Sequence, residues 1–166
     1  TLKCNMTHIK TLPSSFGNLK SLKKLELWGN DFLCKLPDSI GNLRALTELS
    51  LWGGDLTTLP DTIGELSNLR ELRTNRNKIG EYPDSLRDLK SLRFFVWADQ
   101  KPNDIPTIFY EIAKKGVELF PKVYKDNDKP FEGLSLTVAQ IKEFLEKLAG
   151  ISVRCIHDFT YSRKIL

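Results

Sequence analysis

Long hydrophobic runs are missing from this chain of 166 residues. The longest, Phe94–Ala98, falls far short of the ~20 consecutive apolar residues that cross a bilayer as a helix. No membrane-spanning helix is therefore expected. A glycine-rich phosphate-binding loop is also absent, so the sequence carries no sign of a nucleotide site, and no cofactor is expected.

Cysteine and histidine are scarce. The three cysteines, Cys4, Cys34 and Cys155, are odd in number and lack CxxC spacing, so a disulfide framework is not indicated. With only His8 and His157 as further ligands, no zinc site is expected. This cysteine usage favours a reducing compartment, and the predicted location is cytoplasmic. A secreted effector that acts inside a host cell is the alternative.

An excess of charge of one sign is missing as well. Lysine and arginine total 25 against 21 acidic residues, and the net charge is +4. Divided at residue 115, the basic and acidic counts are 17 against 14 before it and 8 against 7 after it. Neither nucleic acid nor an anionic membrane is expected as the main partner. The 40% hydrophobic and 28% charged residues are typical of an ordinary folded domain.

What the chain does contain is a repeat. A hydrophobic residue followed by proline recurs with proline spacings of 24, 23, 23 and 23. One full unit runs from Leu46 to Asn68, and its neighbour from Leu22 to Ala45 has one extra residue near Cys34. The five dipeptides are Leu12-Pro13, Leu36-Pro37, Leu59-Pro60, Tyr82-Pro83 and Ile105-Pro106.

Each unit combines two patterns. Its first part alternates, as in Leu25-Glu26-Leu27 and Leu49-Ser50-Leu51, which predicts a short strand with one buried face. Its second part opens with proline, which suits the first helical position, and in three units an acid follows at the positive helix end. A short helical turn is therefore predicted from each proline. The predicted ends of these turns are about Leu43, Leu66, Leu89 and Ile112.

A strand and a short helix in every unit bury their apolar faces only when the units stack around a shared core. The frame LxxLxLxxNxLxxLPxxIGxLxx resembles that of leucine-rich repeat proteins, most of all the intracellular LPxxIG class of Ras-group-type and bacterial repeats. The resemblance covers about residues 1–114. It implies an α/β leucine-rich repeat solenoid with a parallel concave sheet and short convex helices. It also implies recognition of proteins through the concave sheet.

Two departures from this frame are expected to matter. The turn asparagine is present as Asn30 and Asn77 but not in the other units, so a continuous ladder of side-chain amides is broken there. The segment Phe94–Trp97 carries larger groups than leucine, which suggests that this strand packs under something new. The replacements of the asparagine are Thr7, Gly54 and Gln100.

The repeats are predicted to occupy residues 1–115, with a truncated first unit. Residues 116–166 are predicted to form a C-terminal capping region with a helix near 138–149, which a capping box at Thr137 and Gln140 would begin. That helix is expected to lie against Phe95 and Trp97. The alternative is a truncated second domain. Because the chain opens at Thr1 without a leader, we interpret it as a trimmed or mature fragment.

The alternation predicts which side chains face outward on the concave sheet. Trp28 and Trp52 occupy the same place in adjacent units, so we expect their rings about one strand spacing apart, ~4.8 Å. Paired outward tryptophans favour a protein partner. The alternative is that the two rings only cover each other or lie under another chain segment. The candidate partner-binding residues are Lys24, Glu26, Trp28, Glu48, Trp52, Glu71, Arg73, Asn75, Arg76 and Phe94.

Catalysis is not expected. Cys155, His157 and Asp158 are the residue types of a nucleophilic site, but in a strand Cys155 and His157 would lie ~6.6 Å apart at their Cα atoms. The predicted function is therefore non-enzymatic protein recognition, as part of a larger scaffold, signalling or effector protein. One alternative is the substrate-targeting region of an enzyme whose catalytic domain lies outside this chain. Another is a structural repeat with no ligand on its sheet.

Overall fold

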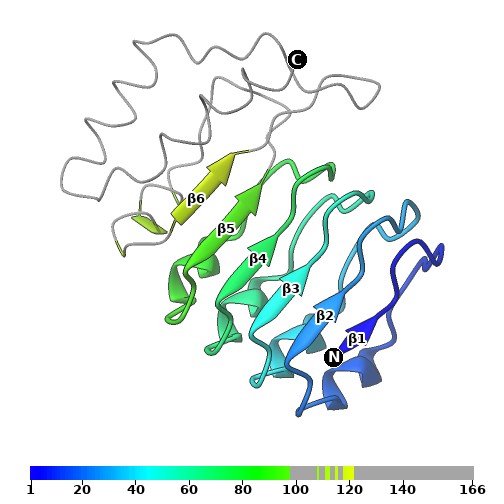
Figure 1. Ribbon diagram of the computed structural model, residues 1–166, viewed down its shortest axis with the longest axis horizontal. Coiled ribbons are helices and arrows are strands. Elements are labelled where there is room, and N and C mark those ends of the chain that lie inside the picture. Colours follow the sequence, from blue (N-terminus) through cyan, green and yellow to red (C-terminus); the bar gives the residue numbers. More distant parts are fainter. Residues whose placement is uncertain (98–107, 109–110, 113–114, 116–117, 122–166) are drawn as a thin grey trace, which may run out of the picture.

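The chain folds as a stack of strand–helix units, which Figure 1 shows as a computed structural model. The structure describes residues 1–97, 108, 111–112 and 115, and the backbone of 118–121. Six parallel strands form one sheet in sequence order. The strands are β1 (Leu2–Lys3), β2 (Lys24–Glu26), β3 (Glu48–Ser50), β4 (Glu71–Arg73), β5 (Phe94–Trp97) and β6 (Glu118–Pro121).

The strands pair so that equal positions of the repeat lie opposite one another in the sheet. Leu25 pairs with Leu49, Leu49 with Leu72, and Leu72 with Phe95, so equal positions of successive units lie side by side. These four side chains are at most 1% exposed. The inward residues thus form one continuous core, and the predicted leucine-rich repeat solenoid is confirmed.

A short 3-10 helix follows each of the first four strands, on the other side of the core from the sheet (Figure 1). The prediction placed proline at the first helical position, but each proline is instead the residue before the helix. Pro37, for example, is extended at φ −71° and ψ 148°, and its carbonyl accepts the Ile40 N–H at 2.9 Å. The helices are η1 (Ser14–Asn18), η2 (Asp38–Asn42), η3 (Asp61–Glu65) and η4 (Asp84–Asp88).

Neighbouring helices touch backbone to backbone. A Cβ added to Gly41 would lie 2.5 Å from the carbonyl oxygen of Thr62 in the next unit, and Gly17 and Gly64 have the same relation to their own neighbours. Arg87 holds this position in the fourth unit, where its guanidinium pairs with Glu111 at 3.4 Å. The glycine therefore permits the close stacking of the convex side, from η1 to η4.

An asparagine side chain holds the turns that follow strands β2 and β4. Asn30 is 1% exposed and donates to the carbonyls of Leu27 and Cys4, both at 2.7 Å, so it joins two units. Asn77 does the same with Thr74 and Leu51. Gly54 stands between these two positions and supplies no amide. The side-chain ladder is therefore interrupted in the middle unit.

The fifth strand differs from the others in its packing. Phe95 and Trp97 are buried at 0% and 2% exposure, and the Tyr82 ring meets Phe95 edge to face at 5.7 Å. Strand β6 pairs with β5, so the sheet continues past residue 115. The predicted capping helix at 138–149 and the residues Cys155, His157 and Asp158 lie outside the described residues. In the described part, no helix is long and apolar enough to cross a membrane.

Candidate functional site

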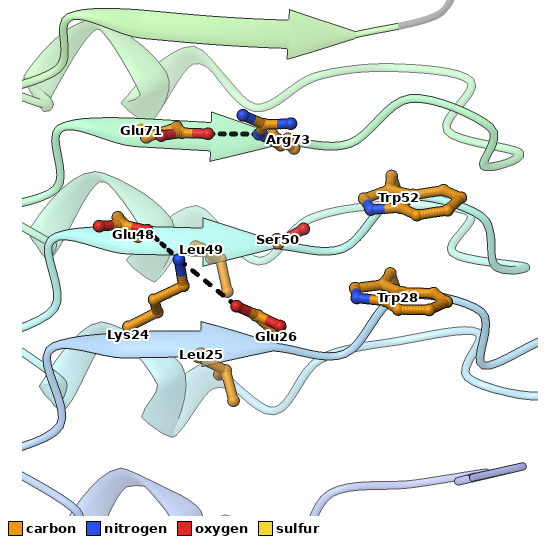
Figure 2. A pocket seen from close by; sticks show the side chains of 10 residues that line it. All are labelled: Lys24, Leu25, Glu26, Trp28, Glu48, Leu49, Ser50, Trp52, Glu71 and Arg73. Carbon is orange, nitrogen blue, oxygen red and sulfur yellow. Dashed lines mark hydrogen bonds and ion pairs between the residues drawn. The ribbon is translucent and has the colours of Figure 1, made fainter. Parts of the chain in front are cut away.

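A pocket of about 270 Å³ opens on the concave face of strands β2, β3 and β4 (Figure 2). Seven of the ten candidate residues named from the sequence line it. Leu25, Leu49 and Ser50 complete the lining. The seven candidates are Lys24, Glu26, Trp28, Glu48, Trp52, Glu71 and Arg73.

Trp28 and Trp52 form one wall of the pocket. Each follows a buried leucine, Leu27 or Leu51, so the alternation turns the indoles outward. The two rings stack with their centroids 4.9 Å apart and their planes 9° from parallel, and both are half-buried. The spacing agrees with one strand separation, as predicted. The indoles therefore form a single aromatic slab that spans two units.

The residue after each tryptophan fixes the turn. Gly29 and Gly53 have φ of 71° and 69°, in the left-handed region that glycine adopts without steric cost. Met6 and Arg76 occupy the equivalent position in the flanking units, at φ 52° and 58°. The Met6 side chain is 63% exposed and lies against Gly29, and Arg76 is half-buried. The short glycines leave the rims of both indoles uncovered.

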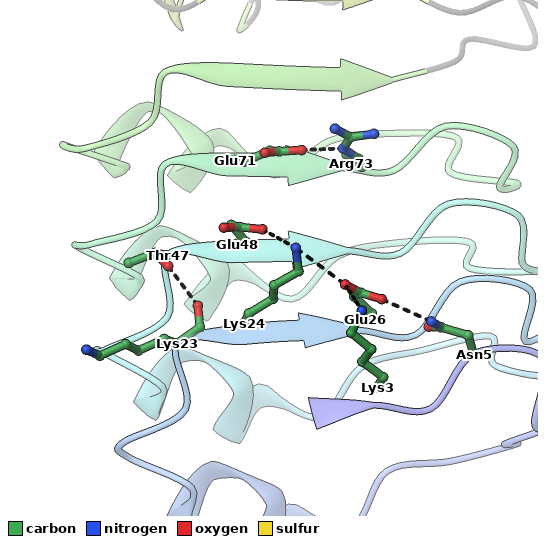
Figure 3. Close-up of polar contacts among 9 residues, drawn as sticks. All are labelled: Lys3, Asn5, Lys23, Lys24, Glu26, Thr47, Glu48, Glu71 and Arg73. Carbon is green, nitrogen blue, oxygen red and sulfur yellow. Dashed lines mark hydrogen bonds and ion pairs between the residues drawn. The ribbon is translucent and has the colours of Figure 1, made fainter. Parts of the chain in front are cut away.

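A chain of ion pairs crosses the lower part of the face (Figure 3). Lys24 lies between two carboxylates, with its Nζ 2.6 Å from Glu48 and 3.4 Å from Glu26, and Lys3 lies 3.2 Å from Glu26. Asn5 also donates its side-chain amide to Glu26 at 3.1 Å. Each of these groups already has a partner, so the chain of charges is neutralised within the protein.

Two pKa values reflect these contacts. The pKa of Glu26 is lowered, first by the hydrogen bond from Asn5 and then by Lys3 and Lys24, against an opposing effect of burial. The pKa of Lys24 is raised, chiefly by its bond to Glu48. Both shifts favour the charged form, so Glu26 and Lys24 stay ionised around neutral pH.

Strand β4 adds a second ion pair to the site, and Ser50 on strand β3 leaves a hollow beside it. Glu71 and Arg73 pair with each other along strand β4 (Figure 3). Ser50 lies between Glu26 and Arg73 in the register of the sheet, and its side chain is far shorter than theirs. The sequence placed Ser50 outward but did not single it out. A small residue among long ones is the signal that marks the hollow.

Three candidate residues lie outside the pocket lining. Phe94 is on the adjacent strand β5 and is 40% exposed. Arg76 lies in the turn after β4. Asn75 is only 6% exposed, whereas Trp28 and Trp52 in the equivalent places are half-buried. The Asn75 carbonyl accepts the Gly53 N–H at 3.0 Å, as the Trp52 carbonyl accepts the Gly29 N–H at 3.1 Å, so the backbone register of the repeat continues to this position.

The exposed aromatic residue Phe32 was not among the candidates named from the sequence. Phe32 is 52% exposed in the loop lengthened by the extra residue near Cys34. Lys10 lies over its ring at 5.8 Å, and the His8 ring is 6.0 Å away. The extra residue was the available signal, since it breaks the period of the repeat. Among the described residues, no three histidine, cysteine or acidic side chains gather as a metal site would require.

Comparison with known proteins agrees with this architecture. Residues 14–112 match a family model described as a leucine-rich repeat region. None of the curated proteins matches the chain. Among solved structures, a leucine-rich repeat protein of Leptospira interrogans is 24% identical with a TM-score of 0.47, and the match covers 75% of this chain and 44% of that one.

A second solved structure is the leucine-rich repeat ectodomain of the Arabidopsis receptor kinase HAESA in complex with an N-terminally extended IDA peptide hormone ligand. It is 27% identical with a TM-score of 0.50, and the match covers 69% of this chain and 20% of that one. This chain thus spans less than half the length of either protein.

Proposed function

Because this chain belongs to the leucine-rich repeat family, we propose that it recognises a protein partner through the concave face of strands β2–β4. The observation that carries the proposal is the stacked, outward and half-buried pair Trp28–Trp52. Tryptophan is among the residues that dominate interface energetics when a partner covers it. The HAESA complex supports the proposal, since that related repeat domain holds a peptide.

The binding energy would come from burying the indole slab. Phe94, 40% exposed on the next strand, would extend the apolar contact. The paired charges around the pocket would contribute orientation more than affinity, because each ion is already neutralised by a neighbour. Arg76, beside the tryptophans in the turn, would help to fix the partner's register.

We further place the repeats in the LPxxIG class. This assignment is supported by the convex glycines Gly17, Gly41 and Gly64, each of which allows the next helix to approach its backbone. We also propose a non-enzymatic role within a larger scaffold, signalling or effector protein, with residues 116–166 as the cap of the solenoid. The free thiols of Cys4 and Cys34 favour an intracellular site of action.

A second candidate role is substrate targeting for an enzyme whose catalytic domain lies outside this chain. The observation in its favour is length: the solved proteins that resemble this chain are more than twice as long as the region they share with it. The same concave surface would then bind the substrate. Activity of a longer chain that is lost on Trp28→Ala/Trp52→Ala would favour this role.

The test is quantitative capture of proteins by immobilised chain, with the Trp28→Ala/Trp52→Ala double variant beside the wild type. A true partner should lose about 2 kcal/mol or more of binding free energy for each anchoring indole. Phe32→Ala is the matched control, because Phe32 is an exposed aromatic outside the pocket. If every captured protein binds the double variant as well as the wild type, the proposal is wrong.

A further inference from the structure

The four segments that lead from each 3-10 helix into the next strand are rich in basic residues. They comprise residues 18–23, 42–47, 65–70 and 88–93. Of the 25 basic and 21 acidic residues in the chain, six and two lie in these segments, which leaves 19 of each elsewhere. The net charge of +4 is therefore the charge of these segments. The six basic residues, which we call the basic edge, are Lys20, Lys23, Arg44, Arg70, Lys90 and Arg93.

These segments lie side by side at the end of the sheet where the strands begin. The Thr47 N–H donates to the Lys23 carbonyl at 2.7 Å, the Arg70 N–H to the Thr47 carbonyl at 2.8 Å, and the Arg93 N–H to the Arg70 carbonyl at 2.9 Å. Successive residues of this row are thus one strand spacing apart, ~4.8 Å. All six side chains of the basic edge are exposed. Figure 3 shows the Lys23 side chain extending away from the sheet, whereas Lys24 lies across the concave face.

The charge of the basic edge is mostly not neutralised within the protein. Arg44 pairs with Glu65 at 2.7 Å. Among the described residues, the other five members of the basic edge form no ion pair. On the concave face, by contrast, Lys24 lies between two carboxylates. The basic edge is therefore the part of this surface that attracts an anion.

Arg70 and Arg93 form the strongest cationic spot of the basic edge. They hold equal positions in adjacent units, and like charges at that separation repel each other. Lys90 adds a third positive charge in the same segment as Arg93. A carboxylate placed between the two guanidinium groups would remove this repulsion, and the planar guanidinium binds a carboxylate through two parallel N–H groups.

A second cationic spot, Lys20 and Lys23, lies two strand spacings from Arg70, ~9.6 Å along the row. Thr47 stands between the two spots and has no charge, and the charge of Arg44 is neutralised by Glu65. In an extended polyproline II segment, residues three apart lie on one side and about 9 Å from each other. Acidic side chains three residues apart can therefore reach both spots.

A continuous polyanion fits this arrangement less well. Each strand of a nucleic acid duplex carries one charge per ~3.4 Å of its axis, and an anionic membrane is a continuous charged surface. Either would bring negative charge close to Glu65 and Asp88, which lie in the same four segments. A peptide can place its carboxylates at the two cationic spots and neutral residues between them.

We infer that the basic edge docks an acidic segment of a protein partner, with Arg70 and Arg93 as its principal contact. The indole slab follows the strands, whereas the basic edge precedes them, so the two surfaces lie at opposite ends of β2–β4. The inference thus goes beyond the proposed function, because it assigns a second surface that does not need the slab.

The test is a titration of the 15N-labelled chain, followed through its backbone amide signals at low ionic strength, where exposed charges are least screened. The probe is the acetylated and amidated peptide (Glu-Gly-Ser)3, and its control has glutamine in place of glutamate. The glutamate peptide should shift the Arg70 and Arg93 signals to saturation, and the glutamine peptide should not. No saturable shift, or equal shifts with both peptides, overturns the inference.

A pair of variants separates the basic edge from net charge. Arg70→Gln/Arg93→Gln should weaken binding of the glutamate peptide about fivefold, which equals about 1 kcal/mol. Lys10→Gln/Lys35→Gln removes the same charge from the loops that follow β1 and β2, and should leave the affinity within about twofold of the wild type. Chemical denaturation should show that the arginine variant is as stable as the wild type, because a repulsion is removed. Equal weakening by both variants would mean that net charge alone attracts the peptide, and the inference would be wrong.

Two further probes distinguish the kinds of anion. Tetrathymidylate, whose three phosphodiesters match the three glutamates in charge, should bind more weakly than the glutamate peptide. Vesicles with about one-third phosphatidylserine should not sediment with the protein at physiological salt. Tighter binding of the nucleotide through Arg70 and Arg93, or sedimentation that Arg70→Gln/Arg93→Gln abolishes, would assign the basic edge to nucleic acid or membrane and overturn the inference.

Discussion

At the closest convex contact three successive units carry the same residue, whereas the strand position at the centre of the concave pocket carries a different residue in each unit. Gly17, Gly41 and Gly64 repeat because each must let the next backbone approach. In the strands, Glu26, Ser50 and Arg73 also hold one position, yet they share neither size nor charge. Close packing is therefore required between neighbouring convex helices from η1 to η4, whereas this pocket depends on one short side chain that stands between two long ones.

Tryptophan provides the sharpest contrast between inside and outside. Trp97 points into the core at 2% exposure, whereas Trp52 lies half-buried on the concave face. Trp97→Ala should cost about 3–5 kcal/mol of unfolding free energy, because it leaves a large cavity. Trp52→Ala should cost no more than ~1.5 kcal/mol, the scale of the lost ring–ring contact.

Chemical denaturation of the two tryptophan variants measures this difference. Equal, large losses of unfolding free energy would mean that the indole slab belongs to the core. The concave face would then contribute to stability as much as the inward face of the sheet does. Equal, small losses would mean instead that the core around β5 tolerates a cavity.

The convex side can be tested with a pair of glycines. Gly41→Ala places a methyl group 2.5 Å from the Thr62 carbonyl, and such overpacking typically costs about 1–3 kcal/mol. Gly80→Ala is the matched control, since nothing lies within 4 Å of the added atom. Its unfolding free energy should stay unchanged or rise slightly. A Gly41→Ala protein as stable as the control would show that the helices can separate without cost.

The fold could be predicted from the sequence because its determinants repeat. Four paired positions, Leu25, Leu49, Leu72 and Phe95, return at the period of the unit, and period-two alternation turns each of them inward. The position of proline was predicted one step too far into the helix. The helices are 3-10 turns of five residues, and the proline carbonyl closes the first turn from outside.

The site was predictable only in part, because it depends on relations between units. The stacking of Trp28 on Trp52 followed from their equal places and the known strand spacing. The burial of Asn75 did not, since Asn75 holds the same place as Trp28 and Trp52 and its own unit carries no signal that it is covered. The hollow at Ser50 is set by what its neighbours in the register carry, which no single unit contains.

The smallest expected effect concerns the ion pairs around Glu26, where the neutral residue Asn5 makes the contact that affects the pKa of Glu26 most. The hydrogen bond from Asn5 is the largest single cause of the lowered pKa of Glu26, and its amide donates directly to a carboxylate oxygen at 3.1 Å. Asn5→Ala should therefore raise the pKa of Glu26, and Lys3→Ala, which removes a hydrogen bond and a charge, should raise it as well. Carboxyl resonances followed through an acid titration measure both shifts. If the pKa of Glu26 stays unchanged in Asn5→Ala, the hydrogen bond from Asn5 does not lower it.

The same shift predicts how stability depends on pH. A carboxyl whose pKa is lower in the folded state than in the unfolded chain stabilises the fold above the unfolded pKa of about 4.3. That contribution is lost as the pH falls through the lower, folded-state pKa. The difference in unfolding free energy between wild type and Glu26→Gln should thus be constant near neutrality and shrink in acid. The convex pair Arg44–Glu65, 2.7 Å apart and exposed on both sides, provides Glu65→Gln as a comparison outside the site. If the stability difference for Glu26→Gln persists unchanged in strong acid, the difference arises from shape and packing. The charge of Glu26 then does not stabilise the folded protein.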